Sequence, residues 1–192
     1  MDVRAAWTIF NRSELLFGQQ ALESALDRLA GEIRAVLADR LPLVLTVMNG
    51  AVVFAGKLLP RLEFPLECDY LHATRYRDTT AGSGIDWQAL PKKAVEGRCV
   101  LVLDDILDEG ITLAAIREKL LDMGAAEVWI AVLAEKRLPR TKPVRADFVG
   151  LEVPDRYVFG MGMDAYGFWR NLPGIYAVTE ASVTDASVTA TL

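Results

Sequence analysis

The chain has 192 residues, a length that suits one domain with a single core. Its 21 basic and 26 acidic residues give a net charge of −5 without a Lys/Arg cluster, which argues against a dedicated nucleic-acid binder. No apolar run reaches the ~20 residues of a membrane span, no signal peptide opens the chain, and the isolated Cys68 and Cys99 favour a reduced cytoplasmic setting.

The first half predicts helices alternating with buried strands. Apolar residues at helical spacing from Leu22 to Val36 predict a packing helix that starts after Ser13, its expected N-cap, and ends near Asp39. The run 43–47 is predicted as a buried strand that leads through Asn49 and Gly50 into an apolar helix over 52–59.

A second predicted strand, 66–73, contains His72, the only histidine, to which we assign no role. The stretch from Arg75 to Gly84 holds two glycines and small polar residues, so it is predicted as a long loop that is either disordered or a functional lid. A returning strand from Trp87 to Leu90 would complete an antiparallel ribbon.

The most informative stretch is Val100 to Thr112. A short apolar run typical of a doubly buried parallel strand meets Asp104 and Asp105, and a helical pattern starts after Gly110 and Thr112. Loops at the carboxyl ends of such strands bind ligands, and the backbone N–H groups of this loop could hold an anion. The paired acids suit two vicinal hydroxyls, or one hydroxyl and a divalent cation; the alternative is a solvated acidic loop.

The last third predicts two more strands, 128–134 and 148–153. The first runs into a basic cluster, 135–140, which is either a solvated turn or an anion or carbonyl contact. An irregular aromatic stretch, 154–164, is expected to form a cap, followed by a helical turn over 166–170 and a strand over 175–178. The segment 179–192 is predicted as a frayed tail.

The string from Val100 to Thr112 resembles the phosphoribosyl pyrophosphate signature of the type I phosphoribosyltransferases: four hydrophobics, two acids, two hydrophobics, Asp, a small or polar residue, Gly and Thr. Four further segments, between about Leu43 and Val178, resemble the purine enzymes of the hypoxanthine-guanine type. They are Val-Met-Asn-Gly-Ala, the Arg-Tyr before the lid, Glu-Lys-Arg-Leu-Pro-Arg, and the stretch from Val-Pro-Asp-Arg-Tyr-Val-Phe-Gly to Arg170.

This resemblance implies one α/β domain over 1–192: a twisted, mainly parallel core sheet flanked by helices (about 40–153), a small hood (about 154–178 plus the N-terminal segment) and a flexible lid ribbon. It implies transfer of a 5-phosphoribosyl group from phosphoribosyl pyrophosphate to N9 of a 6-oxopurine, with Mg²⁺ as cofactor and no nucleic-acid or membrane partner. A homodimer or homotetramer is expected.

In the family's pattern, Asp104 and Asp105 would bind the ribose hydroxyls, at least partly through magnesium, and Asp164 would help hold a second magnesium ion. The magnesium contacts fall on acidic side chains, whereas the 5-phosphate contacts fall mainly on backbone N–H groups. The expected 5-phosphate site comprises Glu109, Gly110, Ile111 and Thr112.

Asp108 would accept the proton of the purine imidazole ring as a general base. Lys136 would donate to the 6-oxo group, Tyr157 would stack on the purine, and the Val158 backbone would read the purine edge.

Arg170 and the amides of Asn49 and Gly50 would contact pyrophosphate, with the lid at Tyr76 closing over the reacting centre and the Met48–Asn49 peptide predicted to be cis. The family commonly has Lys where Asn49 stands, and Arg75 could supply that missing charge.

Two alternatives stay open. One is a xanthine-preferring homologue, and the other is a regulator that senses phosphoribosyl pyrophosphate without catalysis.

Overall fold

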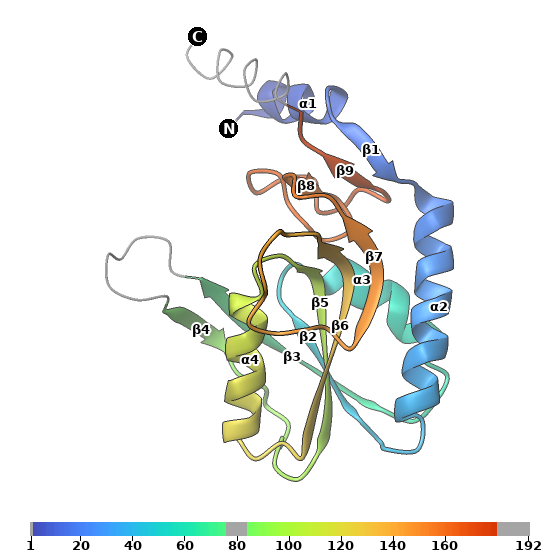
Figure 1. Ribbon diagram of the computed structural model, residues 1–192, viewed down its shortest axis with the longest axis vertical. Helices are drawn as coiled ribbons and strands as arrows, with labels where there is room; N and C mark the ends of the chain where they lie inside the picture. Colours follow the sequence, from blue (N-terminus) through green and yellow to red (C-terminus); the bar gives the residue numbers. More distant parts are fainter. Residues whose placement is uncertain (1, 76–83, 180–192) are drawn as a thin grey trace.

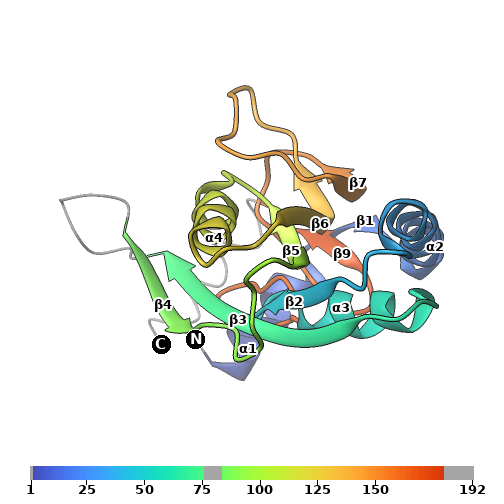
Figure 2. The same ribbon diagram turned by 90° about the horizontal axis from the view of Figure 1, so that it is seen from below.

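A six-stranded sheet with helices on both faces forms the centre of the molecule (Figures 1 and 2). The structure, a computed structural model, describes residues 2–75 and 84–179, so most of the predicted lid and tail lies outside the described residues. The strand order is β4-β3-β2-β5-β6-β7, parallel except for β4, which confirms the mainly parallel sheet and the antiparallel ribbon. The sheet strands are β2 (Leu43–Val47), β3 (Glu67–Arg75), β4 (Ile85–Ala89), β5 (Cys99–Leu107), β6 (Glu127–Lys136) and β7 (Phe148–Val153).

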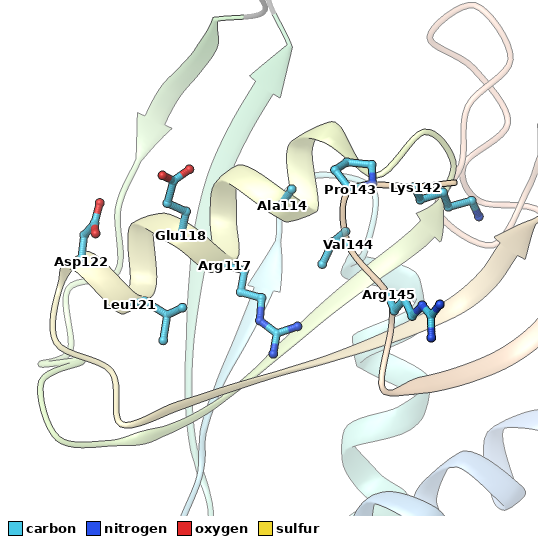
Figure 3. A pocket seen from close by; sticks show the side chains of 9 residues that line it. All are labelled: Ala114, Arg117, Glu118, Leu121, Asp122, Lys142, Pro143, Val144 and Arg145. Carbon is cyan, nitrogen blue, oxygen red and sulfur yellow. The ribbon is translucent and has the colours of Figure 1, made fainter. Parts of the chain in front are cut away.

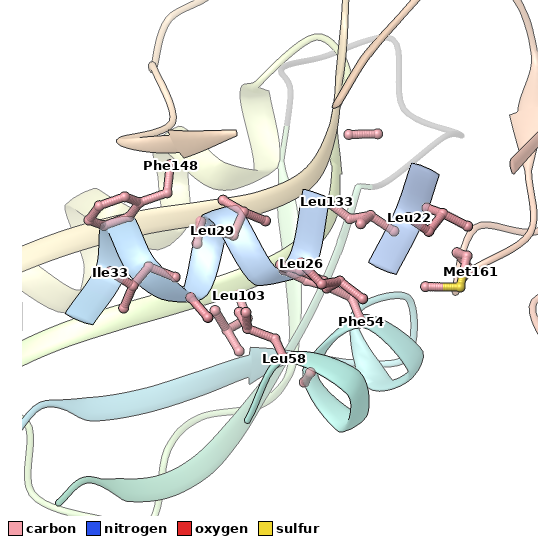
Figure 4. Close-up of a cluster of buried hydrophobic side chains, with 14 of the residues drawn as sticks. Leu22, Leu26, Leu29, Ile33, Phe54, Leu58, Leu103, Leu133, Phe148 and Met161 are labelled. Carbon is pink, nitrogen blue, oxygen red and sulfur yellow. The ribbon is translucent and has the colours of Figure 1, made fainter. Parts of the chain in front are cut away.

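The apolar run of β5 is explained by burial on both faces. Val100 and Val102 face the core beneath α4 (Ile111–Asp122), whereas Leu101 and Leu103 face the core beneath α2 (Gln19–Leu37) and α3 (Val52–Leu58). Figure 4 shows this second core between α2, α3 and the sheet. Burial of each such aliphatic side chain stabilises the fold by about 1.5–3 kcal/mol. The two cores therefore hold in place the edge of the sheet at which the parallel strands end.

The N-terminal prediction was partly wrong. Helix α2 begins after Gly18, and Ser13 instead follows an unpredicted helix α1 (Val3–Asn11), where its Oγ donates to the Ile9 carbonyl at 2.6 Å. The N-cap of α1 is Asp2, whose carboxylate accepts from the Ala5 N–H at 2.8 Å. A serine next to a helix end suits either end, because its hydroxyl can donate as well as accept.

The hood is a separate three-stranded sheet of order β1-β9-β8, packed against α1. Its strands come from both ends of the chain: β1 (Glu14–Phe17), β8 (Val158–Phe159) and β9 (Ile175–Ala177). Trp169 anchors α1 by donating its indole N–H to the Ala6 carbonyl at 3.0 Å. The predicted helical turn over 166–170 is wrong, because Tyr166 and Trp169 have positive φ angles of 53° and 70° and Ala165 bridges Phe168 instead.

Strands β5 and β6 are longer than predicted. The strand β5 continues to Leu107 and β6 to Lys136, so Asp104, Asp105 and Lys136 lie within strands. Within the described residues, no helix combines the length and apolar content needed to cross a membrane.

Candidate active site

A cleft of about 1000 Å³ opens at the carboxyl ends of β2, β3, β5 and β6, beneath the hood. This is the sheet edge at which ligands of open α/β folds bind. Tyr76 lies outside the described residues, and every other residue predicted for the site lines this one cleft. These are Asn49, Gly50, Arg75, Asp104, Asp105, Asp108, Glu109, Gly110, Ile111, Thr112, Lys136, Tyr157, Val158, Asp164 and Arg170.

The loop between β5 and α4 has the geometry of an anion site. Gly110 is the N-cap of α4 and has a φ of 83°, a conformation that favours glycine. A Cβ at this position would lie 3.2 Å from Leu107 and 3.3 Å from Val144, so the space is filled as well. The first N–H groups of the 12-residue helix α4 therefore open toward the cleft beside the Thr112 side chain.

Asp104 and Asp105 are buried carboxylates, with exposed fractions of 9% and 8%. The Asp105 N–H donates to Asp104 Oδ1 at 3.0 Å. Burial raises the pKa of Asp104 well above its usual value, and the neighbouring Asp105 charge raises it further. Burial also raises the pKa of Asp105, although Asp104 and the Arg170 charge oppose that shift. Two buried acids facing a polar cleft are poised to bind a cation or hydroxyl groups.

The loop after β2 touches both the carboxylates and the hood. The Met48–Asn49 peptide is cis, as predicted. A Cβ on Gly50 would collide with the Asp105 carboxylate, and one on Gly162 of the hood would collide with the Gly50 carbonyl. Glycine at both positions is what allows these three segments to approach so closely.

Every strongly basic side chain that lines the cleft is paired with an acid. Lys136 Nζ lies 2.7 Å from Asp108 Oδ2, and Arg170 lies 2.6 Å from Asp164 Oδ1. Arg170 also donates to the Gly162 carbonyl at 2.7 Å, which joins two parts of the segment between β8 and β9.

Glu109 joins three segments at the mouth of the cleft. Its carboxylate pairs with Arg75 at the end of β3 and with Arg140 in the β6–β7 loop. The hydrogen bond from Arg75, and then that from Arg140, lower the pKa of Glu109. Arg75 therefore balances the charge of Glu109 beside the anion loop, and its supply of the charge missing at Asn49 stays a prediction.

Two exposed tyrosines form the hood side of the cleft. The rings of Tyr157 and Tyr166 lie 5.4 Å apart, and the Tyr166 N–H donates to the Tyr157 hydroxyl at 3.2 Å. Both side chains are nearly half exposed, so their rings are accessible from the cleft that they line.

Several cleft residues were not singled out from the sequence. Tyr166 could have been found from its position, because it is an aromatic residue two positions after Asp164, the acid predicted for the site in the hood. His72, Thr74 and Gln88 line the cleft from the β3–β4 ribbon. Their sequence context is that of ordinary strand residues, and only the pairing of β3 with β2 brings them to this edge.

The chain is similar to known proteins over most of its length. A profile described as "Phosphoribosyl transferase domain" matches residues 13–166. The chain belongs to the phosphoribosyl transferase family.

Relatives of this phosphoribosyltransferase match over most of their length. It is 32% identical over 163 residues to the hypoxanthine-guanine phosphoribosyltransferase of Bacillus subtilis, covering 84% of this chain and 91% of that one. It is also 32% identical to the hypoxanthine-guanine-xanthine phosphoribosyltransferase of Tritrichomonas foetus, covering 88% of this chain and 93% of that one.

Solved structures of phosphoribosyltransferases share its fold. A hypoxanthine-guanine-xanthine phosphoribosyltransferase, 30% identical, superposes with a TM-score of 0.77 over 87% of this chain and 97% of that one. A hypoxanthine-guanine phosphoribosyltransferase from Bacillus anthracis, 25% identical, superposes with a TM-score of 0.78 over 86% and 97%. The predicted type I fold is confirmed.

Proposed function

We propose that this enzyme transfers the 5-phosphoribosyl group of phosphoribosyl pyrophosphate to N9 of hypoxanthine or guanine, giving IMP or GMP and pyrophosphate. The observation that carries the proposal is one cleft that combines a helix-start anion loop, two buried carboxylates and a Lys136–Asp108 pair. The anion loop and the two carboxylates suit a phosphorylated ribose. The Lys136–Asp108 pair suits a base in which an oxygen acceptor lies next to a nitrogen that loses a proton.

The reaction forms the N9–C1 bond and breaks the bond between C1 and the pyrophosphate oxygen. Positive charge develops at C1, so stabilising the departing pyrophosphate and excluding water are the main tasks of the cleft. Asp108 takes the proton that leaves the imidazole ring. One of its oxygens accepts from Lys136, and the other is available because the Asp108 side chain is 45% exposed.

Lys136 and the two tyrosines select and hold the purine. Lys136 offers donors only, which favours a 6-oxo group over a 6-amino group. Tyr157 lies at the cleft edge with one face available for stacking. Arg170 and the amides of Asn49 and Gly50 contact pyrophosphate.

The acid pair fits magnesium. Mg²⁺ prefers oxygen ligands and is usually held by one or two carboxylates together with substrate phosphates. Within the described residues no group of three or more acidic, His or Cys side chains is placed to hold a metal ion. Asp104 and Asp105 would hold one ion and Asp164 would help hold a second; when bound, magnesium neutralises charge on the pyrophosphate.

The test is pyrophosphate release with magnesium and phosphoribosyl pyrophosphate across hypoxanthine, guanine, xanthine and adenine, with a no-base control. Release that requires hypoxanthine or guanine supports the proposal. Binding of phosphoribosyl pyrophosphate without release would favour a sensor. A strong preference for xanthine would favour the xanthine alternative. Xanthine is included in the panel because the name of the T. foetus relative includes it.

The proposed partners are phosphoribosyl pyrophosphate and a 6-oxopurine. A homodimer or homotetramer and a cytoplasmic location stay predictions, and light scattering during gel filtration tests the first.

A further inference from the structure

The pairing of β5 with β6 stops where the reaction site begins. The last register pair of these strands is Leu107 with Glu135. Asp108 is the residue after β5, and Lys136 is the last residue of β6. Register pairing between β5 and β6 therefore does not reach Asp108 and Lys136, the two residues proposed to face the purine, although Lys136 pairs with Val153 of β7.

Lys142 bridges the two strand ends at this point. Its Nζ donates to the Leu107 carbonyl at 3.0 Å, to the Lys136 carbonyl at 2.6 Å and to Glu135 Oε1 at 3.0 Å. An ammonium has three donors, so these three acceptors use its full capacity. The Lys142 side chain is only 10% exposed, so water competes little for those bonds.

The segment that carries Lys142 also packs against the anion loop. Figure 3 shows Lys142, Pro143 and Val144 beside the start of α4. Pro143 and Val144 occupy the space that a Cβ on Gly110 would need, at 3.4 and 3.3 Å. The β6–β7 loop thus supports the cleft from behind and contributes no proposed substrate contact at these positions.

We propose that Lys142 is a positioning residue, which fixes the separation of Asp108 and Lys136 and thereby the fit and selection of the purine. This inference rests on the proposed function. Lys142 holds the backbone directly before Asp108 and the backbone of Lys136 itself. A shift of either carbonyl moves Asp108, the proton acceptor, relative to Lys136, the donor to the 6-oxo group. Displacements of about 1 Å can lower the rate ~10²-fold.

The alternative is that Lys142 only neutralises Glu135 and stabilises the fold. The two roles differ in what the variant Lys142→Met does, since methionine keeps most of the stem and removes all three donors. A positioning role predicts a fall in kcat of ~10- to 100-fold and a lower hypoxanthine-to-adenine ratio of kcat/KM. The KM for phosphoribosyl pyrophosphate should change by less than about threefold, because the Lys142 ammonium bonds to Leu107, Glu135 and Lys136, and Pro143 and Val144, which contact the anion loop, are unchanged.

The matched control is Lys93→Met. Lys93 pairs with Glu67 at 2.7 Å, but its side chain is 45% exposed and distant from both strand ends in sequence. This variant should keep the wild-type kcat and base ratio. If Lys142→Met lowers the melting temperature but leaves kcat and the base ratio at wild-type values, the positioning role is wrong.

A readout without activity separates this inference from the proposed function. Amide hydrogen exchange in Lys142→Met should speed up at residues 107–108 and 136–137, and the central parts of β5 and β6 should stay protected. If wild type uses no purine, the proposed function fails, and exchange alone then decides: local acceleration supports the bridge, and unchanged or uniformly faster exchange overturns it.

If Lys142→Met does not fold, Lys142→Arg replaces it. Arginine keeps the charge for Glu135, but its planar guanidinium cannot repeat the three-way geometry of the ammonium. We expect a folded protein with a reduced kcat and base ratio. Wild-type values of both would overturn the inference.

Discussion

The ammonium of Lys136 lies 2.7 Å from Oδ2 of Asp108, so the proposed donor to the purine and the proposed proton acceptor are bound to each other. The register pairing of β5 with β6 stops one residue short of both: Lys136 ends β6, where it pairs with Val153 of β7, and Asp108 follows β5. The purine is therefore expected to contact the two side chains as a pair. For this reason the roles of Asp108 and Lys136 are tested below with different measurements, kcat for Asp108 and the ratio of kcat/KM between bases for Lys136.

Asp108→Asn tests the proton acceptor. The amide keeps the size of the side chain but cannot take a proton at neutral pH, so kcat should fall by ~10²–10⁴-fold. The KM for phosphoribosyl pyrophosphate should stay close to wild type, because the anion loop and acid pair are untouched. A steady-state assay with hypoxanthine measures both. Turnover within about threefold of wild type would mean that Asp108 is not the base.

Lys136→Gln tests base selection. Wild type should use hypoxanthine and guanine well and adenine very poorly, because the ammonium offers only donors and the 6-amino group of adenine gives them no acceptor. Glutamine can donate or accept, so the hypoxanthine-to-adenine ratio of kcat/KM should fall by ~10-fold or more. The ratio is measured with both bases at a fixed level of phosphoribosyl pyrophosphate. Adenine used within about tenfold of hypoxanthine by the wild type would show that Lys136 does not read position 6.

Asp105→Asn should stabilise the protein when magnesium is chelated. Burial raises the pKa of Asp105 and Asp104, so the fold favours their neutral forms. The stability that those neutral forms provide is present at low pH and is lost as pH rises through the raised pKa values. The variant should therefore have a higher Tm than wild type at neutral pH, by ~2–4 °C for each 1 kcal/mol gained in the free energy of unfolding. The difference in Tm should become smaller in acid.

Thermal unfolding from about pH 5 to about pH 8 measures that gap. Asp155→Asn, at an exposed hood position, is the control and should show no comparable pH-dependent gain. A variant less stable than wild type at every pH would contradict the prediction.

Arg75→Gln tests the balance of charge around Glu109. With one of its two arginines gone, the Glu109 carboxylate repels the substrate phosphate more strongly, so the KM for phosphoribosyl pyrophosphate should rise. The groups are partly exposed, so the rise should be about two- to fivefold and should shrink at high salt. The double variant Arg75→Gln/Glu109→Gln should recover part of the loss. No recovery would indicate that Arg75 contacts substrate directly.

The central parts of the strands and the site could be predicted because their signals are local. The apolar run 100–103 is enough to predict a strand that is buried on both faces. The signature that follows it predicts that Asp104, Asp105 and Asp108 lie together at the end of that strand. The true ends of β5 and β6 could not be predicted in this way. Acidic residues disfavour strands, but pairing of Asp104 with Val132 in the neighbouring strand overrides that preference.

Contacts between distant residues account for the remaining errors. Helix α1 packs on Phe159 and Ala165, more than 140 positions away, so nothing near it in the sequence announces its partner. The Arg75–Glu109–Arg140 bridge and the three bonds of Lys142 likewise join loops to the ends of separate strands. Residue types and spacing predicted residues that line the cleft, whereas the contacts behind them became visible only in three dimensions.

The hood strand order β1-β9-β8 has a consequence for synthesis of the protein. The strand β9 near the end of the chain lies between a strand from the beginning and one from the last third. On the ribosome, the elements proposed to bind the ribose and its 5-phosphate, complete by residue 122, can assemble while the hood, which carries Tyr157 and Arg170, still lacks its central strand. Base recognition is then the last property a nascent chain acquires. Shortened chains that stop before Ile175 should retain a foldable sheet core but lose purine selection.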